Sequence, residues 1–128
     1  MIIDDSRTIR HSAEIFLTQA GCHVILAENG FEALAKITER KPDLIFLDVV
    51  MPRLDGYQIC ALIRKNDEHR SIPIVMLSSK DTMFDRARGR LAGSSEYLAK
   101  PFTKQALLEA VEAHAKVGAI TRSRRIAA

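Results

Sequence analysis

Five short apolar runs, separated by longer segments with helical spacing, constrain the fold of this chain more than any other feature. The runs are Met1 to Ile3, Val24 to Leu26, Leu44 to Leu47, Ile72 to Leu77, and Tyr97 to Leu98. Runs that are apolar throughout are typical of parallel strands that helices cover on both faces. The sequence therefore predicts an α/β domain with a doubly wound, five-stranded parallel sheet and five helices.

Apolar residues recur at helical spacing in each segment between the runs. The residues that mark the five expected helices are Ile9, Ala13, Phe16, Leu17 and Ala20; Ala33, Leu34 and Ile37; Ile59, Leu62 and Ile63; Phe84, Ala87 and Leu91; and Leu108, Val111 and Ala115. Asp55 is the expected N-cap of the third helix, with residues 59, 62 and 63 on its inner face. With 128 residues the chain has the size of one domain, which we expect over residues 1–116.

The excess of positive charge lies near the end of the chain. Arg122, Arg124 and Arg125 account for the whole net charge of +3, so the tail over residues 117–128 is expected to be basic and disordered. Such a tail offers no recognition element for a DNA groove, and nucleic-acid binding is not expected. The sequence has no membrane-length apolar stretch and does not open with a signal peptide, which favours a cytoplasmic protein.

Cysteine and histidine predict neither a disulfide framework nor a metal site. Cys22 and Cys60 are too few for such a framework and lie in apolar contexts, so we expect small, buried, reduced residues. The four histidines lack the spacing of metal ligands and are expected at the surface or on helices. Candidate metal ligands must be sought among the carboxylates.

Polar side chains follow four of the five apolar runs. Asp4 and Asp5 follow the first run, Asp48 the third, Ser78 the fourth and Lys100 the fifth. Because ligands of doubly wound sheets bind beyond the carboxyl ends of the strands, we expect these residues to converge. Carboxylates that repel one another, with room left for water and a phosphate, suit Mg²⁺. With a lysine and a hydroxyl nearby, the pattern predicts a phosphoryl site whose nucleophile is an aspartate.

Each of these residues also has a simpler explanation when taken singly. The Asp4-Asp5 pair could cap a helix, Ser78 could belong to an ordinary loop, and Lys100 with Pro101 could form a turn. Their coincidence at the ends of four strands favours a shared site over four unrelated explanations.

Four motifs span almost the whole chain: IIDDS (2–6), LDVVMPRLDG (47–56), IVMLSS (74–79) and YLAKPF (97–102). At these separations they resemble the receiver domain of two-component response regulators. The resemblance implies a flavodoxin-like fold with strand order 2-1-3-4-5. It also implies Asp48 as the phosphoacceptor, Lys100 as the phosphate-pairing cation, Ser78 as the hydroxyl that moves to the phosphate and Tyr97 as the aromatic switch.

The same resemblance implies a magnesium ion as cofactor. Its protein ligands would be Asp5 and Asp48 directly, Asp4 mainly through water, and the backbone carbonyl of Val50. The protein would not be an enzyme in the ordinary sense, because the phosphotransfer that it catalyses is its own phosphorylation, followed by slow autodephosphorylation.

The expected partners are a histidine kinase or histidine phosphotransfer domain and a downstream pilus or motor regulatory protein. The downstream protein would bind the face formed by the fourth helix, fifth strand and fifth helix, with Arg86, Arg90, Tyr97 and Lys104. That face is basic, which suggests an acidic partner. The chain is expected to be a monomer or weak dimer without membrane insertion.

GFEALAKI, MPRLDGYQICALIRKN and the stretch from Met76 to Phe102 resemble, more narrowly, stand-alone receivers of the chemosensory system that controls type IV pilus twitching motility. Since no output domain follows the fifth helix, docking on a partner fits better than transcription. A chemotaxis-type receiver for another motor, and a phosphate sink in a phosphorelay, are the alternatives.

Two features depart from the family pattern. Only Met1 to Ile3 precede Asp4, so we expect either a first strand shorter than is usual in the family or a further segment upstream of Met1. Many members carry a polar residue two positions after the phosphoacceptor, where this chain has Val50, and the position two after Ser78 is Lys80. Both flank the path of an attacking water, so the phosphorylated lifetime is expected to differ from that of fast chemotaxis regulators.

Other classes of function fit the sequence less well. A phosphatase of the haloacid dehalogenase type needs a general-acid aspartate where Val50 stands. A flavin-binding protein needs a phosphate cradle after the first strand, where DDSRT would repel phosphate unless a metal intervened. A receiver-like domain that no longer takes phosphate would be expected to have lost Asp5, Asp48, Ser78 or Lys100, and all four are present.

Overall fold

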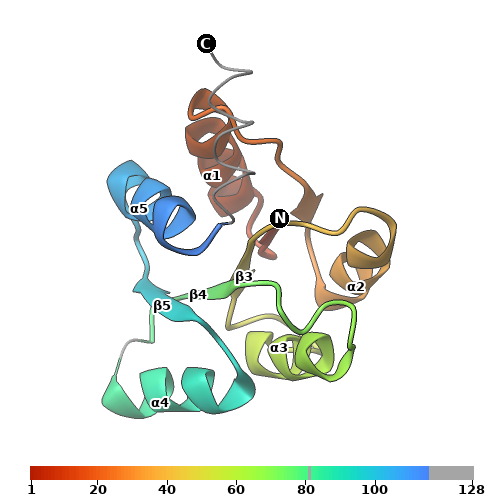
Figure 1. Cartoon of the computed structure of the whole chain (residues 1–128). Helices are drawn as coiled ribbons and strands as arrows, with labels where there is room; N and C mark the ends of the chain where they lie inside the picture. The colour runs from red at the N-terminus through yellow and green to blue at the C-terminus, as the bar shows by residue number, and fades with distance from the viewer. Residues whose placement is uncertain (81, 116–128) are drawn as a thin grey trace.

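A parallel sheet forms the centre of the molecule, and helices cover both of its faces (Figure 1). The structure is a computed structural model that describes residues 1–80 and 82–115; the predicted basic tail, residues 117–128, lies outside the described residues. The strand order β2-β1-β3-β4-β5 confirms the predicted topology. The strands are β1 (Ile2–Ile3), β2 (Leu26–Ala27), β3 (Ile45–Asp48), β4 (Ile74–Ser78) and β5 (Glu96–Ala99).

Each helix begins at a polar residue whose side chain accepts a hydrogen bond from a backbone N–H of the first turn. The helices are α1 (Arg7–Gln19), α2 (Gly30–Glu39), α3 (Gly56–Lys65), α4 (Met83–Ala92) and α5 (Lys104–His114). The expected N-cap Asp55 forms a reciprocal capping box with Gln58. None of the helices in the described part of the chain has the length and hydrophobicity that a membrane span requires.

The sheet separates two hydrophobic cores. Along β3, Ile45 and Leu47 pack on the side of α2 and α3, whereas Phe46 packs on the side of α1 and α5. Figure 1 shows the same division, with α1 and α5 on one face and α2, α3 and α4 on the other. Every residue of β3 is buried, including Asp48 at its end. The central strand is thus held from both faces, and it fixes the position of the carboxylate that ends it.

On α4, periodicity predicts the helix correctly but its apolar pattern does not mark the buried face. Phe84 is 75% exposed and Leu91 is 90% exposed. The helix packs instead through small residues: Gly89 is buried, and Ala92 contacts the core. A Cβ added at Gly89 would lie 3.1 Å from Cδ2 of Tyr97, so the absence of a side chain lets α4 lie close to the sheet.

Several smaller expectations also need correction. Leu62 on α3 is exposed, because the buried face of this helix runs through Ile59, Cys60 and Ile63. His69, expected at the surface or on a helix, is instead buried in the connection before β4. Cys22 is only half-buried, although both cysteines are free as expected. Burial raises the pKa of the Cys60 thiol to about 11, which keeps this side chain a neutral core residue.

Candidate functional site

Three strands deliver charged side chains to one edge of the sheet. Asp4 follows β1, Asp48 ends β3 and Lys100 follows β5. Because Ile3 pairs with Leu47 in parallel register, the next residues of the two strands lie beside each other. Lys100 Nζ donates to Oδ2 of Asp4 at 2.7 Å and to Oδ1 of Asp48 at 3.0 Å. The structure therefore brings together residues that the sequence separates by up to 96 positions.

Asp5 completes an acidic cluster with the two buried aspartates. Asp4, Asp5 and Asp48 each offer a carboxylate oxygen, and these oxygens all lie within 4.8 Å of one another. Asp4 is fully buried and Asp48 is 4% exposed, whereas Asp5 is exposed to solvent. The cluster is thus open on one side and enclosed on the other.

The surroundings of Asp48 and Lys100 raise the pKa values of both groups. Burial raises the pKa of the Asp48 carboxyl to about 7; the hydrogen bond from Lys100 opposes this rise, and the nearby Asp4 adds to it. Burial also acts to lower the pKa of Lys100, but its hydrogen bonds to Asp4 and Asp48 outweigh that effect and raise it. Lys100 therefore stays a cation at neutral pH and partly offsets the charge of the carboxylates.

The cluster fits a hard divalent cation such as Mg²⁺. Its donors are carboxylate oxygens from two enclosed side chains and one exposed side chain, so solvent can complete the coordination shell. One Asp4 oxygen already accepts the backbone N–H of Ser6 at 2.9 Å. The side chain of Val50 is exposed and its N–H lies 3.4 Å from Oδ1 of Asp48. The Val50 carbonyl as a metal ligand stays a prediction.

Ser78 ends β4 with its side chain buried next to this edge. Its Oγ accepts the backbone N–H of Lys80 at 3.0 Å, and its carbonyl accepts the N–H of Lys100 at 2.9 Å. The Lys100-Pro101 peptide bond is cis. The Ser78 hydroxyl is thus hydrogen-bonded to the loop that leads into α4.

Tyr97 lies inside the protein, although sequence analysis expects it on a partner-binding surface. It is 5% exposed, and its hydroxyl donates to the carbonyl of Lys80 at 2.6 Å. Arg86 lies over its ring at 5.6 Å and donates to its backbone carbonyl at 3.3 Å. In this structure Tyr97 contributes to the packing beneath α4 and contributes little surface.

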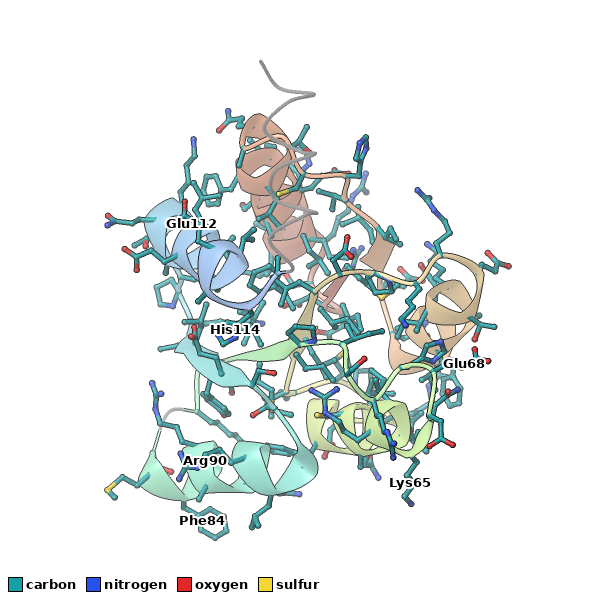
Figure 2. All side chains as sticks on the ribbon, in the orientation of Figure 1. Lys65, Glu68, Phe84, Arg90, Glu112 and His114 are labelled. Carbon is teal, nitrogen blue, oxygen red and sulfur yellow. The ribbon has the colours of Figure 1, made fainter. Side chains whose placement is uncertain are left out.

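The outer surface of α4 combines apolar and basic side chains. Met83, Phe84 and Leu91 are exposed on this helix, as is Arg90. Figure 2 shows Phe84 extending from α4 away from the sheet. Sequence analysis missed these apolar residues as surface groups. The signal that identifies them is the pair of small residues, Gly89 and Ala92, which marks the opposite, packed face.

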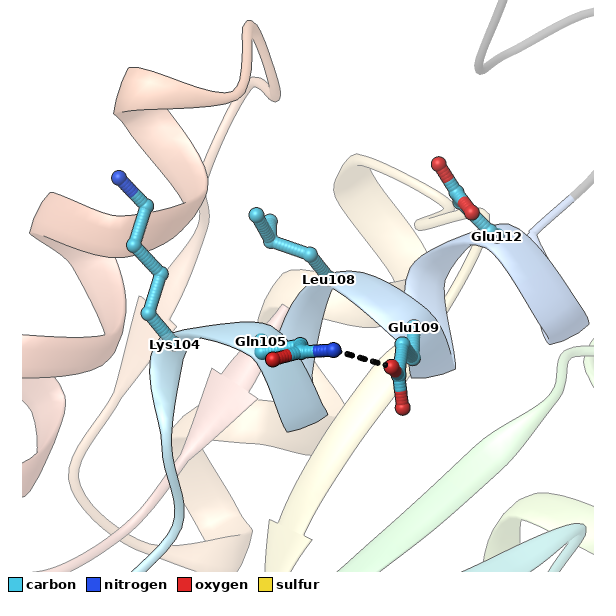
Figure 3. Close-up of a pocket in the computed structure, with 5 residues that line it drawn as sticks. All are labelled: Lys104, Gln105, Leu108, Glu109 and Glu112. Atoms are coloured by element: carbon cyan, nitrogen blue, oxygen red, sulfur yellow. Dashed lines mark hydrogen bonds between the residues drawn. The ribbon is translucent and has the colours of Figure 1, made fainter.

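The fifth helix carries the other basic residue of the expected partner face. Lys104 is exposed, and its Nζ donates to Oε1 of Gln19 on α1 at 2.8 Å. It also borders a hollow along α5, shown in Figure 3, together with Gln105, Leu108, Glu109 and Glu112. Gln105 donates to Glu109 at 2.9 Å within the helix. None of the residues that line this hollow belongs to the acidic cluster.

Comparison with known proteins gives one family. The family model described as the response regulator receiver domain matches residues 1–112. The protein PilG of Pseudomonas aeruginosa is 58% identical over 114 residues, which are 89% of this chain and 84% of PilG. The response regulator MprA of Mycobacterium sp. is 39% identical over 88% of this chain, which spans only about half of MprA.

Solved structures give the same result. The chemotaxis protein CheY4 of Vibrio cholerae superposes with a TM-score of 0.85 and 32% sequence identity, over 88% of this chain and 94% of CheY4. A putative response regulator from Chloroflexus aurantiacus superposes with a TM-score of 0.84 and 37% identity, over 88% of this chain and 92% of its own. The solved structures and the sequence relatives therefore indicate the same family.

Proposed function

This chain belongs to the response regulator receiver domain family, and from that premise we propose that it accepts a phosphoryl group on Asp48 from a phosphohistidine. The donor would be a histidine kinase or a histidine phosphotransfer domain. The observation that carries the proposal is the contact of Lys100 with both Asp4 and Asp48 at the open edge of the sheet. This geometry pairs a nucleophilic carboxylate with a fixed cation.

The proposed transfer makes a bond between an Asp48 oxygen and phosphorus and breaks the bond between phosphorus and the donor imidazole. The electron pair of the broken bond leaves with the imidazole nitrogen. Lys100 offsets the charge of the transferring group, because its Nζ already lies 3.0 Å from the acceptor carboxylate. Mg²⁺, held by Asp5, Asp48, Asp4 through water and the Val50 carbonyl, would reduce the repulsion between the acceptor and the incoming phosphate.

The switch follows from the position of Ser78. A phosphoryl group on Asp48 adds oxygen acceptors, and Ser78 is proposed to move towards them. That movement would break its bond with the N–H of Lys80, whose carbonyl holds Tyr97. The population of conformations at α4, β5 and α5 then changes, and a downstream protein binds the altered face.

The outer surface of α4 indicates the chemistry of that downstream protein. Phe84 and Leu91 offer apolar contacts, while Arg90, with Lys104 on α5, offers positive charge. A complementary surface is apolar at its centre and acidic around it. We propose that this protein acts in the chemosensory control of type IV pilus twitching motility; its similarity to PilG over most of both chains supports the proposal. Action on another motor, or service as a phosphate sink, is the second candidate.

The decisive experiment for the acceptor is phosphorylation by acetyl phosphate and Mg²⁺, followed by intact mass measurement. Wild type is expected to gain one phosphoryl group, and Asp48→Ala is expected to gain none, because the variant lacks the nucleophile. Asp43→Ala is a matched control, since Asp43 is an exposed aspartate just before β3. Equal adduct formation in wild type and Asp48→Ala would exclude Asp48 as the acceptor.

The residue two positions after the acceptor is expected to set the lifetime of the phosphorylated protein. Val50 is 52% exposed and offers an attacking water no side-chain hydrogen bond. In Val50→Asn, one added hydrogen bond to that water is worth about 0.5–1.5 kcal/mol, so phosphate loss should become roughly two to ten times faster. The decay of the phosphorylated mass peak measures this rate. Val50→Thr, which keeps the branched shape of valine, is a second polar substitution for comparison. Unchanged decay in Val50→Asn would contradict the prediction.

A further inference from the structure

A continuous path of hydrogen bonds runs from the proposed site to α4. The hydroxyl of Ser78 accepts the N–H of Lys80 at 3.0 Å, and the carbonyl of Lys80 accepts the hydroxyl of Tyr97 at 2.6 Å. The Tyr97 oxygen lies 3.4 Å from the hydroxyl of Tyr57, which also donates to the carbonyl of Asp85 at 3.3 Å. Tyr57 is therefore the residue through which α3 joins the path to the first turn of α4.

Counting protons decides the direction of the bond between the two tyrosines. Each phenol has one proton to donate. The proton of Tyr97 is used in its short bond to the Lys80 carbonyl, so its oxygen is left to accept. The proton of Tyr57 is then shared between Tyr97 and the Asp85 carbonyl, at nearly equal distances. Tyr57 thus bonds at the same time to the switch residue and to α4.

Packing around the two rings supports the same arrangement. Tyr57 is 8% exposed, and the guanidinium of Arg88 lies 4.3 Å above its ring. Burial raises the pKa of its phenol, and the hydrogen bond with Tyr97 adds to that rise, so the hydroxyl keeps its proton. Gly89 on α4 also lies close to the Tyr97 ring, since a Cβ added there would be 3.1 Å from Cδ2 of the ring. Each ring is thus covered by an arginine of the same helix, α4: Arg86 lies over Tyr97 and Arg88 over Tyr57.

We propose that Tyr57 is a positioning residue of the switch: its hydroxyl holds Tyr97 in the buried position and connects that position to the first turn of α4. In this proposal Tyr97 is already buried before any phosphoryl group is present. The group that responds to Ser78 is the backbone of Lys80, whose N–H loses its acceptor when the hydroxyl moves and whose carbonyl holds Tyr97. The movement of Ser78 in this inference rests on the proposed phosphorylation of Asp48. The bond by which Tyr57 holds Tyr97 does not depend on phosphorylation.

The composition of the chain makes this inference measurable. Wild type has two tyrosines and no tryptophan, so ¹³C-labelled tyrosine gives NMR ring signals from Tyr57 and Tyr97 only. Tyr57→Phe keeps the ring and removes the hydroxyl, which leaves Tyr97 as the single reporter. Tyr97→Phe assigns the signals. Each protein is measured alone and with Mg²⁺ and beryllofluoride, a stable analogue of the acyl phosphate.

Loss of one hydrogen bond should change the ratio of buried to exposed Tyr97 about two- to tenfold. In Tyr57→Phe without any phosphate analogue, the Tyr97 signal is therefore expected to broaden or shift towards the position of an exposed tyrosine. The response of Tyr97 to beryllofluoride should change in the variant as well. If the ring of Tyr57 only filled space, Tyr57→Phe would leave both the Tyr97 signal and that response as in wild type, because phenylalanine fills the same space.

The test separates this inference from the proposed function. A Tyr97 signal with the wild-type position, width and beryllofluoride response in Tyr57→Phe would overturn the role of Tyr57. Phosphorylation of Tyr57→Phe by acetyl phosphate is expected to equal that of wild type, because the bonds of the Tyr57 hydroxyl go to Tyr97 and to the backbone of Asp85, outside the acidic cluster. If wild type itself takes no phosphate, the proposed function fails, and the comparison without analogue still decides whether Tyr57 holds Tyr97.

Discussion

Replacement of Lys100 by methionine is expected to slow phosphorylation by acetyl phosphate on the order of 100-fold, because it removes the fixed cation from the acceptor. Methionine keeps much of the length of the side chain and removes its charge. Lys100 contacts both Asp4 and Asp48 inside the protein, so the variant leaves two buried carboxylates facing each other. Removal of one partner from a buried ion pair lowers the free energy of unfolding by about 3–5 kcal/mol.

The loss of stability in Lys100→Met should also depend on Mg²⁺. A divalent cation at the cluster replaces part of the missing positive charge, so Mg²⁺ is expected to raise the melting temperature of the variant more than that of wild type. Lys65→Met is the matched control, because Lys65 is exposed on α3, where Figure 2 shows it extending away from the sheet, and it does not belong to the acidic cluster. Phosphorylation of Lys100→Met at the wild-type rate would contradict the role of the lysine.

Replacement of Gly56 by alanine is the second large effect that we expect. Gly56 begins α3, and its N–H donates to the carbonyl of Val49 at 2.8 Å. A Cβ at this position would overlap the carbonyl oxygen of Asp48 and lie 2.7 Å from Cα of Val49. Because these obstacles are backbone atoms, the end of β3 or the start of α3 must move. We expect a loss of about 2–4 kcal/mol in unfolding free energy, in the range of overpacked or strained sites.

The same movement should displace the acceptor carboxylate, so Gly56→Ala should also lose most of its phosphorylation. Gly30→Ala is the comparison, since Gly30 begins α2 in an equally crowded place. There the added Cβ would meet Cδ1 and Cγ1 of Ile59, which are side-chain atoms that can rotate. Urea unfolding of both variants measures the difference. A smaller loss in Gly56→Ala than in Gly30→Ala would refute the backbone contact as the cause.

The sheet and the site were predictable for the same reason. An apolar run that ends in Asp48 carries both signals at once, because the run predicts a buried strand and the charge marks its carboxyl end. Chain order then places Asp4 and Lys100 at the same edge, and the contacts of Lys100 agree with that placement. The observed strand ends differ from the ends of the apolar runs by one or two residues, as in β2. Backbone pairing sets the end of a strand, whereas hydrophobicity sets the end of an apolar run.

The packing of α4 was not predictable in the same way. Phe84 and Leu91 have helical spacing, but spacing cannot distinguish an apolar face that packs from one that meets solvent. The buried face contains Gly89, which contributes no hydrophobic signal, and its importance depends on how close Tyr97 lies in space. Tyr57 was missed for a related reason, since its role depends on a contact with a residue 40 positions away.

The bonds of Lys100 connect the beginning, the middle and the end of the domain. Its partners lie 96 and 52 positions earlier in the chain, just after β1 and at the end of β3. During synthesis the ribosome therefore releases both aspartates long before the lysine that pairs with them. A nascent or truncated receiver that lacks β5 and Lys100 has the proposed acceptor carboxylate without its cation. The order of synthesis thus leaves this pairing incomplete until the chain has been made as far as Lys100.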